Sequence, residues 1–242
     1  MSGNFVYNRV LLKLSGETLK GKFDHGYDAE AVRNVVARIK PLVDQGLEIA
    51  IVVGAGNIWR GVMGANTGMD PVTCDYMGML GTMMNGLCLK EFCCNGGIDA
   101  EVYGSTPFST AIKQFDRAQA MRDLAAGKVV IFAGGTGSPF FTTDTTAALR
   151  ALETQCDAVL KATKVDGIYT ADPFKDPNAV RFKVLTFEEA LSRQLKVMDA
   201  AAFSLCREHD LPIVVFDFYA ADLEKVLAGD TSEGTIVRNC KA

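Results

Sequence analysis

The sequence predicts an α/β fold, in which one domain over residues 1–242 forms an αβα sandwich around an open, mainly parallel sheet. Three observations support this prediction. Short apolar runs alternate with helical patterns from end to end. Three of the apolar runs end in loops rich in glycine or polar residues, as is typical where a strand ends. No linker, low-complexity tract or internal repeat divides the chain.

The composition is that of a globular protein with a sizeable core, with 48% hydrophobic and 22% charged residues. A net charge of -4 argues against non-specific nucleic-acid binding, so an anionic ligand would need a local basic site. Seven cysteines without a C-x-x-C pair fit reduced thiols better than a zinc site or a disulfide framework. Because neither a signal peptide nor a membrane-spanning run is apparent, we expect a cytoplasmic protein that does not enter membranes.

The first elements are a strand over residues 9–16 and, after a loop over 20–27, a helix that Asp28 caps and that runs to Val43. Lys13 lies near the carboxyl end of the strand. Open α/β sheets bind their ligands at that edge, so Lys13 is either a ligand-binding residue or an ordinary surface lysine.

The second strand, residues 47–53, runs into the turn Gly54-Ala55-Gly56-Asn57. Trp59 replaces the third glycine of a dinucleotide fingerprint, and no Walker-type phosphate loop occurs in the chain. We place Arg60 one turn into a following helix, where it is either a bidentate ligand for an oxyanion or a solvated arginine.

Residues 71–94 predict a helix that is apolar nearly all round, which is typical of a core or an oligomer interface. Asp75 near its start either binds first-turn amides or faces a ligand. A third strand over residues 100–103, a helix over 114–124 and a strand over 129–133 follow.

The loop over residues 134–144 is the most informative stretch of the chain. Its glycines let the backbone approach a ligand, and the following helix directs free N–H groups and its positive dipole end at an anion. Thr142 or Thr143 can cap that helix, and Asp144 in the first turn suits the dipole. The alternative is a plain strand-to-helix connection that binds nothing.

A fifth strand over residues 156–161 ends in a third loop, 162–173, where Lys161 and Lys164 could contact phosphates. Helices near residues 186–193 and from 196 onward, a strand over 212–216, a helix over 223–227 and a last strand over 235–237 complete the chain. Asp199 is either a helix N-cap or a functional carboxylate.

Together these motifs resemble the amino-acid kinase superfamily. The resemblance rests on Lys13-Leu14-Ser15-Gly16, on Gly54-Ala55-Gly56-Asn57 with Arg60-Gly61, and on residues 164–173. Residues 75–80, 135–144 and 196–199 resemble the bacterial UMP kinase (uridylate kinase) subfamily, and the similarity covers nearly the whole chain. It implies the amino-acid kinase fold and a cytoplasmic homohexamer that makes UDP and ADP from UMP and MgATP in pyrimidine nucleotide biosynthesis. Relatives that phosphorylate glutamate, aspartate or carbamate often carry an aspartate where Lys164 stands.

The resemblance also implies the roles of individual residues. For catalysis, the physics of phosphoryl transfer predicts that Lys13, Arg60 and Lys164 neutralise charge on the transferring group and that Asp144 and Asp199 orient the lysines or the metal waters. For ATP binding the resemblance implies Lys13, Leu14, Ser15, Gly16, Gly56, Arg60, Thr163, Tyr169 and Asp172. For UMP binding it implies Ala55, Asp75, Thr136, Gly137, Ser138, Pro139, Phe140, Phe141, Thr142 and Thr143. Mg²⁺ would arrive with ATP and keep most of its waters, so no residue is predicted as a metal ligand.

One position departs from the family pattern, which commonly has three glycines where this chain has Gly54-Ala55-Gly56. An alanine keeps the backbone N–H but resists positive φ, so a contact with UMP requires that Ala55 is not left-handed. Residues 21–27 correspond to a region associated with GTP activation; activation by GTP and inhibition by UTP are hypotheses. A same-fold kinase of another acceptor and a nucleotide sensor without catalysis remain as alternatives, and a dinucleotide oxidoreductase lacks its fingerprint.

Overall fold

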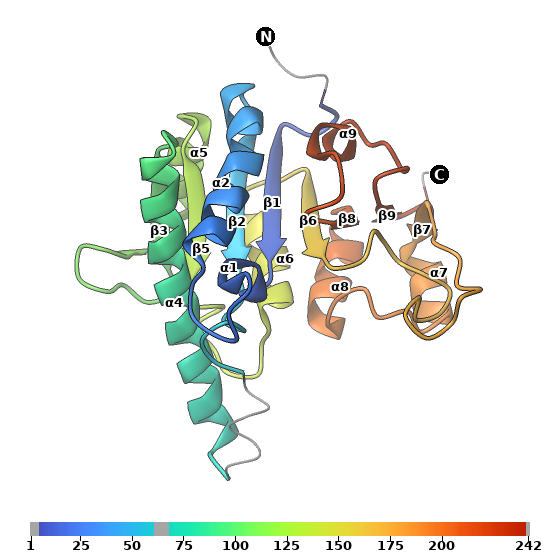
Figure 1. Ribbon diagram of the computed structural model, residues 1–242, viewed down its shortest axis with the longest axis horizontal. Helices are drawn as coiled ribbons and strands as arrows, with labels where there is room; N and C mark the ends of the chain where they lie inside the picture. Colours follow the sequence, from blue (N-terminus) through green and yellow to red (C-terminus); the bar gives the residue numbers. More distant parts are fainter. Residues whose placement is uncertain (1–4, 61–67, 241–242) are drawn as a thin grey trace.

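The computed structural model describes residues 5–60 and 68–240 and confirms the α/β fold class (Figure 1). Within these residues nine strands form one sheet in the order β4-β3-β5-β2-β1-β6-β8-β9-β7. The β8–β9 pair is antiparallel, and the other neighbouring pairs are parallel. The sheet is therefore open and mainly parallel, as predicted.

The elements alternate along the chain. The strands are β1 (Arg9–Leu14), β2 (Glu48–Val53), β3 (Ala100–Gly104), β4 (Lys113–Gln114), β5 (Val129–Ala133), β6 (Ala158–Thr163), β7 (Val184–Thr186), β8 (Ile213–Asp217) and β9 (Thr235–Arg238). The helices are α1 (Glu17–Lys20), α2 (Ala29–Asp44), α4 (Pro71–Asn95), α5 (Arg117–Ala125), α6 (Thr143–Glu153), α7 (Phe187–Ser192), α8 (Ala200–Glu208) and α9 (Leu223–Leu227).

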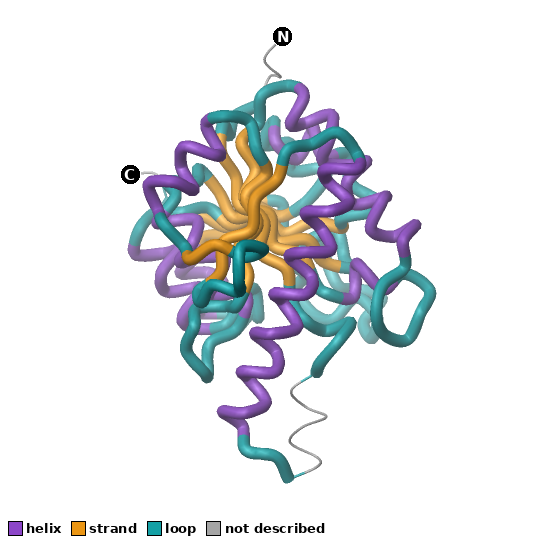
Figure 2. Tube along the Cα trace, turned by 90° about the vertical axis from the view of Figure 1, so that its left-hand side faces the viewer, coloured by secondary structure: helices purple, strands orange, loops and turns teal. Residues whose placement is uncertain are grey.

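Helices cover both faces of the sheet and create two hydrophobic cores (Figure 2). Buried residues of α2, α4 and α9 pack on one face, and those of α5, α6, α7 and α8 pack on the other. Because strand side chains alternate between faces, Val10 and Leu12 of β1 join the first core and Leu11 joins the second. This is the predicted sandwich.

The same alternation places two lysines on the α6 face of the sheet. Lys13 in β1 has the parity of Leu11, and Lys161 in β6 has the parity of Val159, which also belongs to the α6-side core. The two lysines are register partners on adjacent parallel strands. Like charges at such neighbouring positions repel, so the fold has to supply a compensating group from the helix above them.

Helix α4 is the longest element and extends past the ends of the strands (Figures 1 and 2). Asp70 caps its start by accepting a hydrogen bond from Thr73 N at 3.0 Å. Its buried residues include Gly86 and Leu89, while Leu80 and Met84 are exposed. A helix that is apolar all round therefore faces both the core and the surface.

Several predicted boundaries differ from the structure. The helix predicted from Gln114 begins at Arg117, because Asp116 caps it through Gln119 N and the preceding residues pair with β3 as β4. The fifth strand is Ala158–Thr163, since Asp157 instead accepts backbone hydrogen bonds at the start of β1. Arg60 follows a turn over residues 56–58 and is not helical. The sequence also did not predict α1, β4 or β7.

No helix in the part of the chain that the structure describes combines the length and the apolar character needed to cross a membrane. All seven cysteines are free thiols. Cys93 lies in the core whereas Cys94 is exposed, and burial raises the pKa of the Cys93 thiol to about 12. The vicinal pair is thus divided between core and surface.

Candidate active site

The loops that follow β1, β2, β5 and β6 come together at the carboxyl edge of the sheet, because these four strands are neighbours and parallel. The loops after β1 and β2 lie against each other at Gly16. A Cβ on Gly16 would clash with the carbonyl oxygen of Gly54 and lie 2.7 Å from Gly56 N. Only glycine permits this approach.

Two buried amides fix the turn after β2. Asn57 and Asn85 exchange side-chain hydrogen bonds of 3.1 and 2.8 Å, and Asn85 Nδ2 also donates to the carbonyl oxygen of Gly54 at 2.7 Å. Ala55 is not among the residues with positive φ. The alanine therefore sits in the turn without backbone strain, which meets the condition set by the sequence. Gly81 of α4 makes room for it, since a Cβ there would lie 2.9 Å from Ala55 Cβ.

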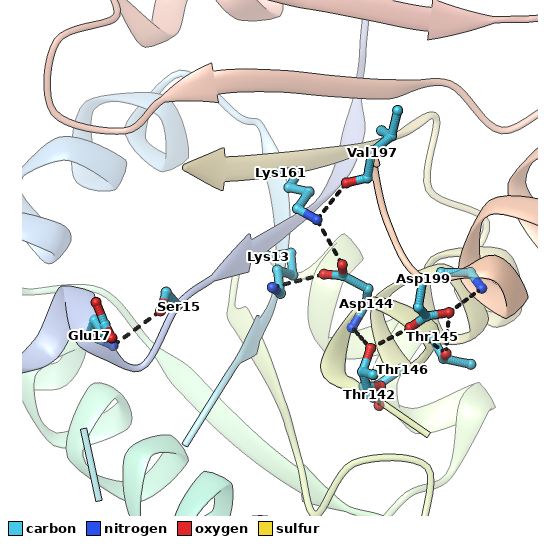
Figure 3. Close-up of polar contacts among 11 residues, drawn as sticks. Lys13, Ser15, Glu17, Thr142, Asp144, Thr145, Thr146, Lys161, Val197 and Asp199 are labelled. Atoms are coloured by element: carbon cyan, nitrogen blue, oxygen red, sulfur yellow. Dashed lines mark hydrogen bonds and ion pairs between the residues drawn. The ribbon is translucent and has the colours of Figure 1, made fainter. Parts of the chain in front are cut away.

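Asp144 lies between the two lysines of the α6 face (Figure 3). Lys13 Nζ is 2.8 Å from its Oδ1, and Lys161 Nζ is 2.7 Å from its Oδ2. Lys161 Nζ also donates to the carbonyl oxygen of Val197 at 2.6 Å. The Lys13–Asp144 contact is an ion pair, whereas Lys161 is held by both a carboxylate and a carbonyl oxygen.

One carboxylate shared by two lysines leaves a net positive charge. Burial by itself would raise the pKa of Asp144, but the charges of Lys13 and Lys161 outweigh burial and hold that pKa below the usual range. Burial lowers the pKa of Lys161, and the attraction of Asp144 offsets this only in part. The cluster is thus a partly buried cationic centre suited to a phosphate group.

Asp199 is a helix N-cap, which was one of its two predicted roles, and it also binds side chains of a second helix. Its side chain caps α8 by accepting from Ala202 N at 2.8 Å. It also accepts hydrogen bonds from Thr142 Oγ1 and, at 2.8 Å, from Thr145 Oγ1 in α6. Burial would raise the pKa of Asp199, but these hydrogen bonds lower it. Asp199 therefore joins the starts of α6 and α8 and does not contact the lysines.

The loop after β5 is held by two residues that the sequence singled out. Thr142 is the N-cap of α6 and accepts a hydrogen bond from Asp144 N at 3.0 Å. Asp75 of α4 accepts from Phe140 N at 2.7 Å. Phe140 has a φ of 69°, a conformation that non-glycine residues rarely adopt, and its side chain is 76% exposed. Asp75 thus binds an amide of this loop and not one of its own first turn.

A second charged cluster forms around Glu17, a residue that the sequence did not single out. Each oxygen of its carboxylate holds a different cation: Oε1 pairs with Arg60 Nη2, and Oε2 is 2.7 Å from Lys164 Nζ. The hydrogen bond from Lys164 lowers the pKa of Glu17 most, with further lowering from the Lys164, Arg60 and Lys20 charges and opposition from burial.

A cavity of about 260 Å³, here called the α4 cavity, opens between α4 and the loops after β2 and β5. Five of the residues predicted to bind UMP line it: Ala55, Asp75, Phe141, Thr142 and Thr143. Its other lining residues are Trp59, Cys74, Gly78, Met79, Thr82 and Gly135. The remaining predicted residues, 136–140, do not line it.

A second cavity of about 630 Å³, the α1 cavity, opens beside α1 and the carboxyl end of β6. Four residues predicted to contact ATP or its phosphates line it: Lys13, Ser15, Thr163 and Lys164. Its other lining residues are Glu17, Thr18, Lys20, Gly21, Lys161, Ala162, Phe218 and Tyr219. Its wall therefore contains four lysines and two aromatic residues.

Some predicted ATP-binding residues lie outside this lining. Leu14 is fully buried in the core, so any contact from it has to come from its backbone. Tyr169 donates a hydrogen bond to Asp166 at 2.5 Å, and Asp172 accepts from Phe174 N at 3.0 Å, both within the loop after β6. Gly16 and Gly56 shape the wall without lining it.

Sequence reasoning missed three features of the site, each of which had a detectable signal. Lys161 was predicted to contact phosphates but not to share a carboxylate with Lys13, although both are lysines inside apolar strands. Glu17 follows the Lys13–Gly16 motif directly. Tyr219 follows the carboxyl end of β8, where ligands of open sheets are expected.

Among residues 5–60 and 68–240 no cluster of three or more His, Cys, Asp or Glu side chains could hold a metal ion. Asp144 and Glu17, the carboxylates nearest the lysines of the α1 cavity, are both engaged by cations. This donor set suits a metal that binds to ligand phosphates and water rather than to a cage of side chains.

Comparison with known proteins supports a specific family. A model of the amino acid kinase family matches residues 8–217. The structure is similar to a UMP kinase from Bacillus anthracis, with 34% identity, a TM-score of 0.93 and 97% coverage of both chains. It is also similar to a UMP kinase from Ureaplasma parvum, with 33% identity, a TM-score of 0.89 and coverage of 96% of this chain and 99% of the other. A uridylate kinase from Archaeoglobus fulgidus matches with 26% identity, a TM-score of 0.72 and coverage of 94% and 99%.

Proposed function

The chain belongs to the amino acid kinase family, and from this premise we propose that it is a UMP kinase that transfers the γ-phosphoryl group of ATP to UMP, giving UDP and ADP. One observation carries the proposal. Lys13 and Lys161 line the α1 cavity and pair with Asp144, whose neighbour Thr143 lines the α4 cavity. A cationic centre thus connects a basic cavity for a donor with a smaller cavity for an acceptor.

In this proposal UMP occupies the α4 cavity and ATP the α1 cavity. The proposed choice of UMP rests on the loop over residues 134–144 and on the similarity to UMP kinases over nearly the whole chain. Asp75, Phe141 and Thr142 line the acceptor side, and the positive dipole end of α6 lies there. The aromatic side chain of Tyr219 suits the adenine end of the donor.

The chemistry needs positioning and charge stabilisation more than bond-making groups on the protein. A phosphate oxygen of UMP, already anionic, attacks the γ-phosphorus while the bond to the β,γ-bridging oxygen breaks, so a general base is unnecessary. Lys13, with Arg60 and Lys164, neutralises charge on the transferring group. Asp144 orients Lys13 and Lys161, and Asp199 orients the start of α6. Mg²⁺ bound to ATP would supply further neutralisation of the phosphate oxygens.

We also propose a cytoplasmic homohexamer, with GTP as an activator and UTP as an inhibitor. The apolar surface of α4 supports self-association. Regulation by GTP is supported by the loop over residues 21–27, which corresponds to a region associated with GTP activation in the family. Initial rates measured across a GTP titration test this regulation directly. Unchanged rates would remove GTP from the proposal.

Product analysis tests the reaction. The purified protein is incubated with MgATP and, separately, with UMP, CMP, dTMP, glutamate or aspartate, and nucleotide products are quantified. We expect UDP and ADP in equal amounts with UMP alone. Formation of product with another acceptor would support kinase activity but contradict the proposed specificity for UMP. Saturable UMP binding without turnover on any acceptor would instead favour a nucleotide sensor.

A further inference from the structure

Three loops of the candidate site meet at one carboxylate. Glu17 begins α1, directly after the loop that follows β1, and Figure 3 shows its backbone N–H bonded to Ser15 Oγ, at 3.3 Å. Arg60 comes from the loop after β2, and Lys164 from the loop after β6. No other side chain in the part of the chain that the structure describes pairs with cations from two of these loops.

Both cations are poorly restrained without Glu17. The side chain of Lys164 is 82% exposed and that of Arg60 is 50% exposed, whereas that of Glu17 is 25% exposed. Within the described residues Arg60 has one further hydrogen bond, of 3.2 Å, from its Nε to the carbonyl oxygen of Gly56. An exposed cation on a long stem samples many rotamers, so a shared carboxylate is what limits both side chains to the edge of the site.

The stem of Glu17 is itself well placed for this role. A Cβ on Gly56 would lie 3.6 Å from Glu17 Cγ, so the stem lies along the turn after β2. Glu17 and Lys164 both line the α1 cavity with Lys13. The Glu17 cluster carries one negative and two positive charges and therefore adds one net positive charge beside that of the Lys13–Asp144–Lys161 cluster.

We propose that Glu17 is a positioning residue, whose carboxylate holds Arg60 and Lys164 together at the α1 cavity so that both reach the transferring phosphoryl group. This inference rests on the proposed function. The negative charge of Glu17 would have two opposite effects on the reaction. The carboxylate orders the cations, which favours the transition state, and its negative charge opposes the approach of a polyphosphate, which weakens ground-state binding.

Glu17→Gln keeps the size of the side chain and removes its charge. We expect kcat with ATP and UMP to fall about 10- to 100-fold, the usual cost of misplaced catalytic groups. The KM for ATP should stay unchanged or fall, because the cavity gains a net positive charge. Glu17→Asp retains the charge but is one methylene shorter, and should give an intermediate kcat. The thermal unfolding midpoint should not change in either variant.

Glu30→Gln is the matched control, since Glu30 also lies in the first turn of a helix, is exposed and forms no ion pair within the described residues. It should leave kcat and KM unchanged. In a Lys164→Met background, Glu17→Gln should cost less than it does alone, because the two residues act through one contact. Additive losses, an unchanged kcat in Glu17→Gln, or a raised KM for ATP with normal kcat would each overturn the inference.

The pairing of Glu17 with Lys164 can also be tested by a measurement that does not depend on enzymatic turnover, and therefore not on the proposed function. Lys164 is acylated with an amine-reactive reagent, and the rate at that residue is followed by mass spectrometry. Loss of the partner in Glu17→Gln should accelerate acylation of Lys164 severalfold, and an equal rate would contradict the pairing. If the wild-type protein shows no turnover with any acceptor, the proposed function fails while the acylation rate still decides whether Glu17 holds Lys164.

Discussion

At the scale of single residues, the ratio of one carboxylate to two lysines determines the charge at the centre of the site. Asp144 is close to both Lys13 and Lys161, yet among residues 5–60 and 68–240 only Lys161 has a second protein partner, the carbonyl oxygen of Val197. Lys161 is therefore held by two protein groups, whereas Lys13 is held by Asp144 alone within the described residues and lines the α1 cavity. This difference makes Lys13 the stronger candidate for contact with a transferring phosphate.

Lys13→Met should lower kcat about 10²- to 10³-fold, the usual effect of removing one group that stabilises transition-state charge. UMP affinity should change little, because Lys13 does not line the α4 cavity. Steady-state kinetics and equilibrium UMP binding measure the two effects. Lys183→Met is the control, as Lys183 is exposed and lies beside β7 at the opposite edge of the sheet from β4. Near-normal turnover in Lys13→Met would remove Lys13 from the mechanism.

At the scale of elements, α4 lines the α4 cavity with one side and is exposed at the molecular surface on another. Asp75, Gly78 and Met79 face the cavity, while Tyr76, Leu80 and Met84 are exposed at a spacing of four residues. Residues four apart lie on one side of a helix, so these three form a continuous apolar stripe. Monomeric proteins rarely leave such a stripe uncovered, which favours an interface between copies of the chain.

Leu80→Glu combined with Met84→Glu should reduce self-association, because each places a charge in an apolar contact. We expect the wild-type protein to sediment as an oligomer and the variant as a smaller species with normal far-ultraviolet circular dichroism. Leu191→Glu is the matched control: this leucine of α7 is 49% exposed, compared with 59% for Leu80, and lies on the other face of the sheet. A wild-type monomer at working concentration would contradict the prediction.

At the scale of the whole molecule, the Lys13–Asp144–Lys161 cluster ties β1, α6 and β6 together and so contributes to the stability of the fold. The pKa of Asp144 is lower in the folded state than in the unfolded chain. Ionisation of Asp144 therefore stabilises the fold fully above the unfolded value, about pH 4, and this contribution is lost as pH falls through the lower folded value.

Asp144→Asn should lower the free energy of unfolding at pH 7 by on the order of 3 kcal/mol, because it leaves two partly buried lysines without their counter-ion. Below about pH 4 the variant should lose stability less steeply than the wild type, since its amide does not titrate. Urea unfolding across this pH range measures both effects. Asp99→Asn, at an exposed aspartate without an ion pair among the described residues, should keep the wild-type slope.

The sequence by itself determined the alternation of strands and helices, the resemblance to UMP kinases, which the comparisons confirm, and several caps, including Asp28, Thr142 and Asp199. These features depend on local periodicity and on contacts between residues a few positions apart. Roles within the site, by contrast, stay predictions.

Only the tertiary structure decided that Asp144 serves Lys161 as well as Lys13, that Asp75 holds Phe140 N, and that Glu17 pairs with Arg60 and Lys164. Each of these contacts joins residues far apart in the chain. They depend on strand register and helix packing, which the residues next to them in sequence do not encode.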